Sequence, residues 1–322
     1  GVGTQWANST SGEYFVCTDA TAGSNVWTNV GAGTGDIQPF HGWGVSFGFS
    51  STGGIAGTNH NQIDKFSFTS SDDATDVGDV TESRREAGGA FSTTHGYTHG
   101  GYGLSNVIDK YAYASVADAT DVGNISGNRT VGFGVSSTTY GYSFGGEPST
   151  NIIEKYSFAS DGNATDVGDL TAASRINRPG GNQSSTHGYC CGGGSSNVID
   201  KWTFVSDANA TDVGNLTVYG YQFGSNSSST YGYTTGGSRG DEIDKFSFTS
   251  DGDATDVGDL LSSSGSNGKF GQNSQTYAYA CGGSNDGGLD TIEKYSFASD
   301  GNSVDANQNL TQARGTGGSA QV

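Results

Sequence analysis

A recurring acidic turn carries the residue types that could hold a hard cation such as calcium. In the copy at 160–169, which reads SDGNATDVGD, Asp161, Asn163, Asp166 and Asp169 place four oxygen ligands close together. However, no copy has the Asp-x-Asp-x-Asp-Gly spacing followed by a bidentate Glu. Asp, Asn and Gly are also favoured in tight turns because their side chains cap the backbone. We therefore predict ordinary turns without a cofactor, and calcium binding is the alternative.

Cations and aromatic rings gather in the segments that vary along the chain. Of the 14 Lys and Arg residues, six stand at one repeated position, and the other eight lie in variable segments: Arg84, Arg85, Arg129, Arg175, Arg178, Arg239, Lys269 and Arg314. Aromatic residues accompany them: Trp43, Phe133, Tyr219, Tyr221 and Phe270. Aromatic faces suit sugar rings, and guanidinium groups suit carboxylate or sulfate substituents.

From this we predict a glycan-type binding site formed by Arg85, Arg129, Arg178, Tyr219 and Lys269. The alternative is that the arginines, above all Arg84 and Arg175, brace neighbouring repeats against one another.

Signals for catalysis are weak. The chain has no Gly-x-Ser-x-Gly elbow, and no paired carboxylates stand out among its 33 acids. His95 and His187 occupy a repeated position that otherwise holds Tyr or Phe, which indicates a structural function. Cys191 and Cys281 each precede a Gly-Gly pair at another repeated position, so we expect small buried side chains; a metal or redox function is the alternative. No catalytic residue is predicted.

These residues belong to a repeat that organises nearly the whole chain. The stretch at 151–170, NIIEKYSFASDGNATDVGDL, returns in five further versions, and its lysines stand at 65, 110, 155, 201, 245 and 294. The intervals of 45, 45, 46, 44 and 49 residues between those positions are typical of a solenoid or a propeller. Each period contains four short candidate strands and no helical pattern. We therefore predict an all-β propeller of four-stranded antiparallel blades.

The repeat resembles the kelch repeat and the propeller of galactose-oxidase-like proteins. The shared features are an aromatic strand, a Gly-Gly pair such as Gly100-Gly101, a following Ile-Asp/Glu-Lys-aromatic strand, and arginines ahead of the first strand at Arg84, Arg175 and Arg314. The resemblance covers about residues 47–310. An Ala-Thr-Asp-Val-Gly turn stands where the family usually has a tryptophan, which marks a divergent member. The oxidases would imply a copper site of Tyr and His ligands, which the sequence does not identify.

The two ends of the chain look like parts of one further blade. Residues 311–322 imitate a first strand, and residues 12–30 imitate a second and the start of a third, with Cys17 in the column of Cys191 and Cys281. Completing a blade from both termini removes the unpaired edge at the seam. We therefore favour seven blades over six, within a single domain at 1–322 whose repeats lie near 37–80, 87–125, 131–170, 180–216, 223–260 and 269–310.

The composition limits the partners. A formal net charge of −19 disfavours nucleic acid and anionic membrane, which need a positive field, and no apolar run approaches 18 residues. Because the chain lacks Met, we expect a processed product or a piece of a longer protein. An up-and-down blade places its variable loops on one face, and binding surfaces commonly form on such loops.

In overall style, the near-identical repeats and the Gly, Ser, Thr, Asn and Asp content resemble propellers carried by tail fibres and other surface proteins of bacteriophages, marine ones in particular. This resemblance implies a non-catalytic, extracellular or virion-surface module that binds a host glycan or receptor. Its partners would be other virion proteins or further copies of the chain. The alternatives are a secreted kelch-like carbohydrate oxidase and a purely architectural virion or filament subunit.

Overall fold

The chain forms two compact units, Gly1–His41 and Gly42–Val322. The computed structural model describes residues 1–7, 13–30, 44–55, 57–103, 105–130, 133–173, 178–261, 267–284 and 288–322. Within these residues nearly all regular structure is β-strand, and the one helix is a 3-10 turn, η1 (Gly237–Arg239). None of the described segments is a helix long and apolar enough to cross a membrane.

The first unit contains a three-stranded antiparallel sheet. Strand β2 (Tyr14–Asp19) lies between β1 (Gln5–Ala7) and β3 (Val26–Asn29). Phe15 and Cys17 are buried, and the ring of Trp6 lies 5.3 Å from that of Phe15. Alternation of buried and exposed side chains along β2 is the pattern of a sheet with one covered face.

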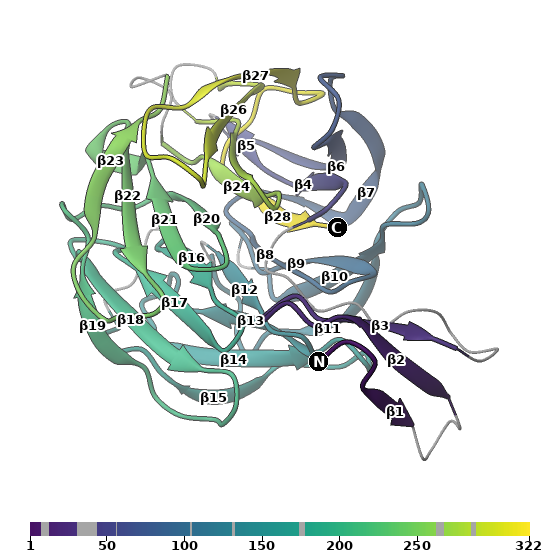
Figure 1. Cartoon of the computed structure of the whole chain (residues 1–322). Coiled ribbons are helices and arrows are strands. Elements are labelled where there is room, and N and C mark those ends of the chain that lie inside the picture. Colours follow the sequence, from purple (N-terminus) through teal and green to yellow (C-terminus); the bar gives the residue numbers. More distant parts are fainter. Residues whose placement is uncertain are drawn as a thin grey trace. The chain divides into compact units, whose positions relative to one another are not determined.

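The second unit is a propeller of four-stranded antiparallel blades, as the sequence predicts (Figure 1). In five blades the four strands follow one another along the chain. They are β8 (Gly88–Phe91), β9 (His95–His99), β10 (Val107–Ala112) and β11 (Thr120–Asn124); β12 (Gly134–Ser136), β13 (Tyr140–Phe144), β14 (Ile152–Ser157) and β15 (Thr165–Asp169); β16 (Gly180–Gln183), β17 (His187–Cys191), β18 (Val198–Thr203) and β19 (Thr211–Asn215); β20 (Gly224–Ser227), β21 (Tyr231–Thr235), β22 (Glu242–Ser247) and β23 (Thr255–Asp259); and β24 (Phe270–Asn273), β25 (Tyr277–Cys281), β26 (Thr291–Ser296) and β27 (Val304–Asn309).

The remaining blade joins the two ends of the second unit. Its strands are β28 (Gly318–Gln321), β4 (Phe47–Ser51), β6 (Thr58–Ser67) and β7 (Thr75–Arg84), with the short β5 (Gly54–Ile55) paired to the start of β6. We call it blade 1, and the blades that begin with β8, β12, β16, β20 and β24 are blades 2 to 6. Figure 1 shows the yellow C-terminal strand beside the purple β4.

The seven antiparallel sheets agree in number with the sequence prediction, but the last blade is assembled differently. Residues 311–322 were expected to pair beside residues 13–17, and this is wrong: Gly318 pairs with Ser51, and Gln321 pairs with Gly48. In blade 1, β4, β6 and β7 come from one continuous segment of the chain, and β28 from the C-terminal end adds the innermost strand. The ring therefore holds six blades, the alternative count, and the sheet at residues 5–29 belongs to the first unit.

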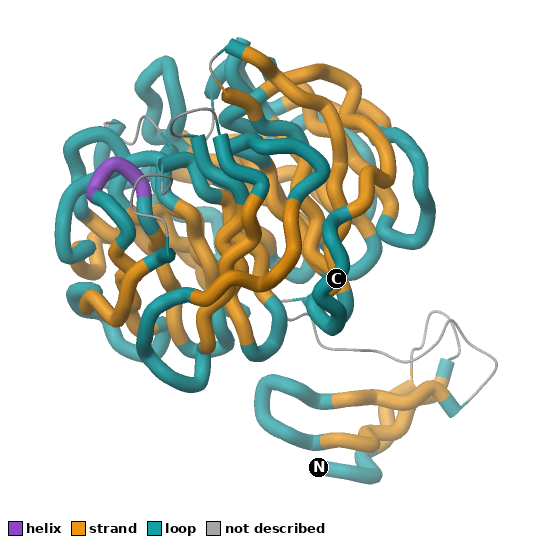
Figure 2. Tube along the Cα trace, turned by 90° about the horizontal axis from the view of Figure 1, so that it is seen from above, coloured by secondary structure: helices purple, strands orange, loops and turns teal. Residues whose placement is uncertain are grey.

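Contacts between neighbouring blades close the ring. The innermost strands touch in the order β28, β8, β12, β16, β20, β24 and back to β28. At each junction an aromatic residue of one blade's second strand packs on two aromatic residues of the next blade, one on its third strand and one directly after that strand, with ring centroids 4.7–6.4 Å apart. Tyr97 on Tyr156 and Phe158 is one of the six sets. Figure 2 shows the strands of the propeller edge-on.

Two glycine positions explain why the repeat is so uniform. In the Thr-Asp-Val-Gly turn, Gly123 has φ +152°, and a Cβ there would lie 2.3 Å from the carbonyl oxygen of Gly162 in the next blade. In the aromatic-Gly-aromatic strand, a Cβ on Gly96 would lie 2.3 Å from the ring of Tyr111. Glycine thus permits both the junction between blades and the aromatic packing within a blade.

Candidate functional site

Two of the four predicted ligand-binding cations, Arg129 and Lys269, lie instead in a ring of buried ion pairs. The acidic residue of the Ile-Asp/Glu-Lys motif is buried in every blade of the ring: Asp64, Asp109, Glu154, Asp200, Asp244 and Glu293. Five of these carboxylates bind a cation among the described residues: Asp109 binds Arg84 at 2.6 Å, Glu293 binds Lys269 at 2.8 Å, Asp64 binds Arg314 at 3.1 Å, Glu154 binds Arg129, and Asp244 binds Arg239. We call this set the carboxylate ring.

The Arg84–Asp109 ion pair of the carboxylate ring joins two neighbouring blades. Arg84 is the last residue of β7 in blade 1, whereas Asp109 lies on the third strand of blade 2, so their ion pair crosses the junction. Burial lowers the pKa of Arg84 and raises the pKa of Asp109, and each charge opposes the effect on the other. Thr81 strengthens the same junction by donating its hydroxyl to Asp109 at 2.7 Å.

This geometry corrects the predicted ligand site. Arg129 and Lys269 are 4% and 0% exposed, and both are bound to carboxylates, so direct contact with a surface ligand is excluded in this arrangement. Arg129 and Lys269 agree instead with the alternative interpretation, in which these cations brace the repeats. The same holds for Arg84 and Arg314. Arg175 and Trp43 lie outside the described residues.

Arg178 is buried too, but it has no counter-ion among the described residues. Its side chain is 1% exposed, and none of its three guanidinium nitrogens has a hydrogen-bond partner. The guanidinium carbon lies 5.7 Å from the centroid of the Phe133 ring. Burial lowers the pKa of Arg178 to about 10, so the group is still charged at neutral pH. The predicted exposure of Arg178 is therefore wrong, because the side chain turns inward.

Two of the five predicted residues stay accessible on the variable face. Arg85 is partly exposed, and its guanidinium carbon lies 3.7 Å from the centroid of the Tyr102 ring. Its Nη1 donates to Asn59 at 2.9 Å, and its Nε lies 3.4 Å from Glu86. Tyr102 is 49% exposed, which leaves ring surface for a ligand. We call Arg85 and Tyr102, with Asn59, the Arg85 platform.

The other accessible aromatic residues of this face come from the segment between β19 and β20. Tyr219 is 64% exposed and Tyr221 is 37% exposed. Because loops between strands two and three and between blades lie at the same edge of every blade, Tyr102, Tyr219 and Tyr221 all belong to the variable face. Tyr102 and Asn59 were not among the residues predicted from the sequence to bind a ligand. Tyr102 does follow a Gly-Gly pair that other copies continue without an aromatic residue at this position.

The opposite, constant face carries the repeat lysines. Lys110 binds Asp161 of the next blade at 2.8 Å, and Lys155, Lys201 and Lys245 make the equivalent pairs with Asp207, Asp251 and Asp300. These four lysines therefore join neighbouring blades on this face. At the two junctions of blade 1 the repeat departs, because Val116 and Ser71 stand where the other blades have the aspartate.

The missing aspartate leaves a groove at the junction of blades 1 and 2. Lys65 has no ion pair among the described residues, and its ammonium lies 3.8 Å from the centroid of the Phe47 ring. The groove has a volume of about 400 Å³ and includes Asp72 and the 79% exposed Val116. We call it the Lys65 groove.

The acidic turns serve the junctions between blades. Asn163 Oδ1 accepts a hydrogen bond at 3.0 Å from the backbone N–H of Asn124 in the preceding blade. Asp161 binds Lys110, Asp166 Oδ1 accepts from the N–H of Gly168 at 3.1 Å, and the backbone carbonyl of Asp169 accepts from Ala210. Hydrogen bonds to the backbone and one ion pair therefore engage the side chains of Asp161, Asn163 and Asp166. Within the described part of the chain, no three His, Cys, Asp or Glu side chains are grouped so that they could hold a metal ion.

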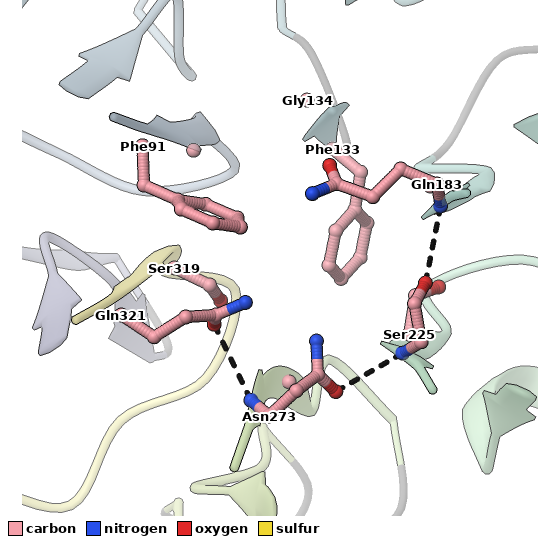
Figure 3. A pocket seen from close by; sticks show the side chains of 12 residues that line it. Phe91, Phe133, Gly134, Gln183, Ser225, Asn273, Ser319 and Gln321 are labelled. Carbon is pink, nitrogen blue, oxygen red and sulfur yellow. Dashed lines mark hydrogen bonds between the residues drawn. The ribbon is translucent and has the colours of Figure 1, made fainter. Parts of the chain in front are cut away.

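A small cavity lies on the propeller axis (Figure 3). Its volume is about 30 Å³, and its walls are Gly89, Phe91, Phe133, Gly134, Gly181, Gln183, Ser225, Ser227, Gly271, Asn273, Ser319 and Gln321. Side chains link successive innermost strands here: the N–H of Phe91 donates to Ser136 Oγ, that of Ser136 to Gln183 Oε1, and that of Gln183 to Ser227 Oγ. The lining contains no Tyr, His or Cys, so the copper ligands of a sugar oxidase do not fit this cavity.

The remaining candidate residues are packed in the fold. Cys191 and Cys281 are completely buried on the equivalent strands β17 and β25, as predicted, and all four cysteines are free thiols. Cys17 lies in the first unit instead of a closing blade. His99 is buried with Nδ1 3.0 Å from the Tyr156 hydroxyl, and burial lowers its pKa to about 3.

The chain was compared with known protein families and with curated proteins. No protein-family model matches the chain, and no curated protein is significantly similar to it.

Proposed function

We propose that this propeller is a non-catalytic binding module that recognises a polar ligand of the glycan type on a host or cell surface. The supporting observation is the Arg85 platform. Among the five predicted residues, Arg85 is the cation that remains accessible, and its guanidinium carbon lies over a half-exposed tyrosine ring. A ring face with a guanidinium beside it suits a sugar ring that carries a carboxylate or sulfate.

The placement of the platform supports the same function. Asn59 comes from blade 1, and Tyr102 comes from blade 2, so Arg85 connects variable loops of two blades. The carboxylate ring beneath these loops is repeated and buried, which supplies a rigid base. A single platform offers little contact area, so useful binding strength would come from several copies on one particle. Attachment to a phage tail fibre or another virion protein would provide those copies.

The test is glycan binding measured on a sulfated and uronic-acid array and then by calorimetry. Tyr102→Ala should weaken binding about tenfold, because loss of a stacked ring costs roughly 1–2 kcal/mol. Arg85→Gln should weaken acidic glycans and leave neutral ones nearly unchanged. Tyr231→Ala is the matched control, since Tyr231 is a 37% exposed tyrosine beside Lys245 on the constant face.

The Lys65 groove is the competing location for the same function. Its volume of about 400 Å³ is within the range of small-ligand pockets, and its lysine lacks the aspartate that four other junctions supply. If Lys65→Ala abolishes binding while Tyr102→Ala has no effect, the ligand binds the constant face. Full binding by the Arg85, Tyr102 and Lys65 variants would reject both locations, whereas a wild type that binds no glycan would favour the architectural alternative.

A further inference from the structure

Arg178 has surroundings that differ from those of every other buried cation described in the ring. Arg84, Arg129, Arg239, Lys269 and Arg314 all bind a carboxylate. Arg178 is equally buried, yet its guanidinium makes no hydrogen bond to a described residue. Leaving a charge buried without a partner is among the most destabilising arrangements in a protein.

The nearest acidic influence does not supply a partner. Glu86 raises the pKa of Arg178 through its charge, but the Glu86 carboxylate lies 3.4 Å from Arg85 and makes no hydrogen bond to Arg178. Both residues belong to a belt of left-handed residues that surrounds the axis. In this belt the N–H of Gln222 donates to the carbonyl of Arg178 at 2.9 Å, and that of Glu86 donates to Thr316 at 2.7 Å.

The axial cavity shares one wall with the surroundings of Arg178 and contains hydrogen-bond donors. This wall is Phe133, whose ring centroid lies 5.7 Å from the Arg178 guanidinium carbon. Gln183 Nε2 and the hydroxyls of Ser225 and Ser319 line the cavity and are buried without a partner. Because Gln183 Oε1 accepts from the N–H of Ser136, the Gln183 NH₂ group is turned toward the axis, as Figure 3 shows.

We propose that the axial cavity binds one small inorganic anion of chloride size, which the Gln183 amide and the Ser225 and Ser319 hydroxyls hold and the Arg178 charge balances. The size follows from the cavity volume of about 30 Å³, which suits roughly two water-sized positions and excludes a sugar or a phosphate ester. The positive ring edges of aromatic residues such as Phe91 and Phe133 also suit an anion. The site is independent of the glycan proposal.

The test is thermal unfolding of the whole chain at constant ionic strength, with sodium gluconate replaced stepwise by sodium chloride or bromide. The melting temperature should rise by several degrees and then saturate, because an anion bound to the folded state stabilises it by mass action. A formal net charge of −19 disfavours nonspecific anion uptake, so a saturable response reports a specific site. A crystal grown in bromide should show one anomalous peak on the axis.

Three variants make the test specific. Arg178→Gly suits the left-handed φ of 64° and should remove the halide response, and in gluconate it should melt above the wild type because an unpaired charge is gone. Gln183→Glu should also lose the response, because a carboxylate replaces the NH₂ donor. Gln222→Gly, at φ 60° in the same belt, should keep it. Equal melting temperatures of the wild type in gluconate and chloride, or a halide response retained in both Arg178→Gly and Gln183→Glu, would overturn the proposal.

Discussion

Replacing Asp64 by Asn should strongly destabilise the propeller at its seam. Asp64 is completely buried, and its two carboxylate oxygens accept from Thr311 Oγ1 at 2.6 Å, from Thr311 N–H at 2.9 Å and from Arg314 at 3.1 Å. All three donors belong to the segment that leads into β28. An asparagine is neutral and has one acceptor oxygen. Its NH₂ group faces either the Thr311 hydroxyl, which can turn to accept from it, or the Thr311 N–H and Arg314, which cannot, and in neither orientation is the Arg314 charge balanced.

The expected loss of stability arises because Arg314 stays buried without its carboxylate partner. Arg314 is completely buried, and its Nη2 keeps just the carbonyl and hydroxyl of Ser50 as partners. Removing one partner of a buried ion pair costs about 3–5 kcal/mol. For a unit of this size that corresponds to a melting temperature lower by roughly 6–20 °C in scanning calorimetry.

Two comparisons show whether the buried charge is the cause. Asp166→Asn changes an exposed turn residue and retains the acceptor for Gly168, so it should cost less than about 0.5 kcal/mol. Adding Arg314→Met to Asp64→Asn should recover part of the stability, because the unpaired charge is removed. A melting temperature of Asp64→Asn within about 2 °C of the wild type would refute the reasoning, and so would a double variant as unstable as the sum of its parts.

Two further predictions concern protons and surface charge. The His99 pKa is lowered from 6.5 to about 3 in the folded state, so its contribution to stability is complete above pH 6.5 and is lost as the pH falls toward 3. Between pH 6.5 and 5, urea unfolding of the wild type should lose up to about 2 kcal/mol more than that of His99→Gln, and parallel profiles would contradict this. Val116→Asp should restore the missing partner of Lys65 and raise stability by about 0.2–1 kcal/mol at low salt. That gain should disappear in 1 M salt, and a gain that persists there would show that an ion pair is not its source.

Residue type and spacing predicted one part of the candidate site and missed another. Variation between repeats correctly indicated which face of each blade carries the divergent loops. It did not separate Arg85, which is partly exposed, from Arg129 and Lys269, which are buried. The difference arises because a buried carboxylate at the repeated Asp/Glu position needs a cation from nearby sequence. Five blades meet this need among the described residues. In one of them the cation is Arg239, which ends η1 between the second and third strands and does not come from a segment between blades.

The sequence by itself determined the repeat, the four strands of a blade and the all-β propeller. These features depend on local chemistry, since Gly96 and Gly123 stand where a side chain would collide with a ring or with the next blade. It also indicated small buried side chains at Cys191 and Cys281. Only the tertiary structure decided that β28 completes blade 1 and that Arg178 turns inward without a carboxylate. Strand closure and ion pairing join residues that are distant along the chain, so their outcome depends on which edges and charges the folded ring leaves unsatisfied.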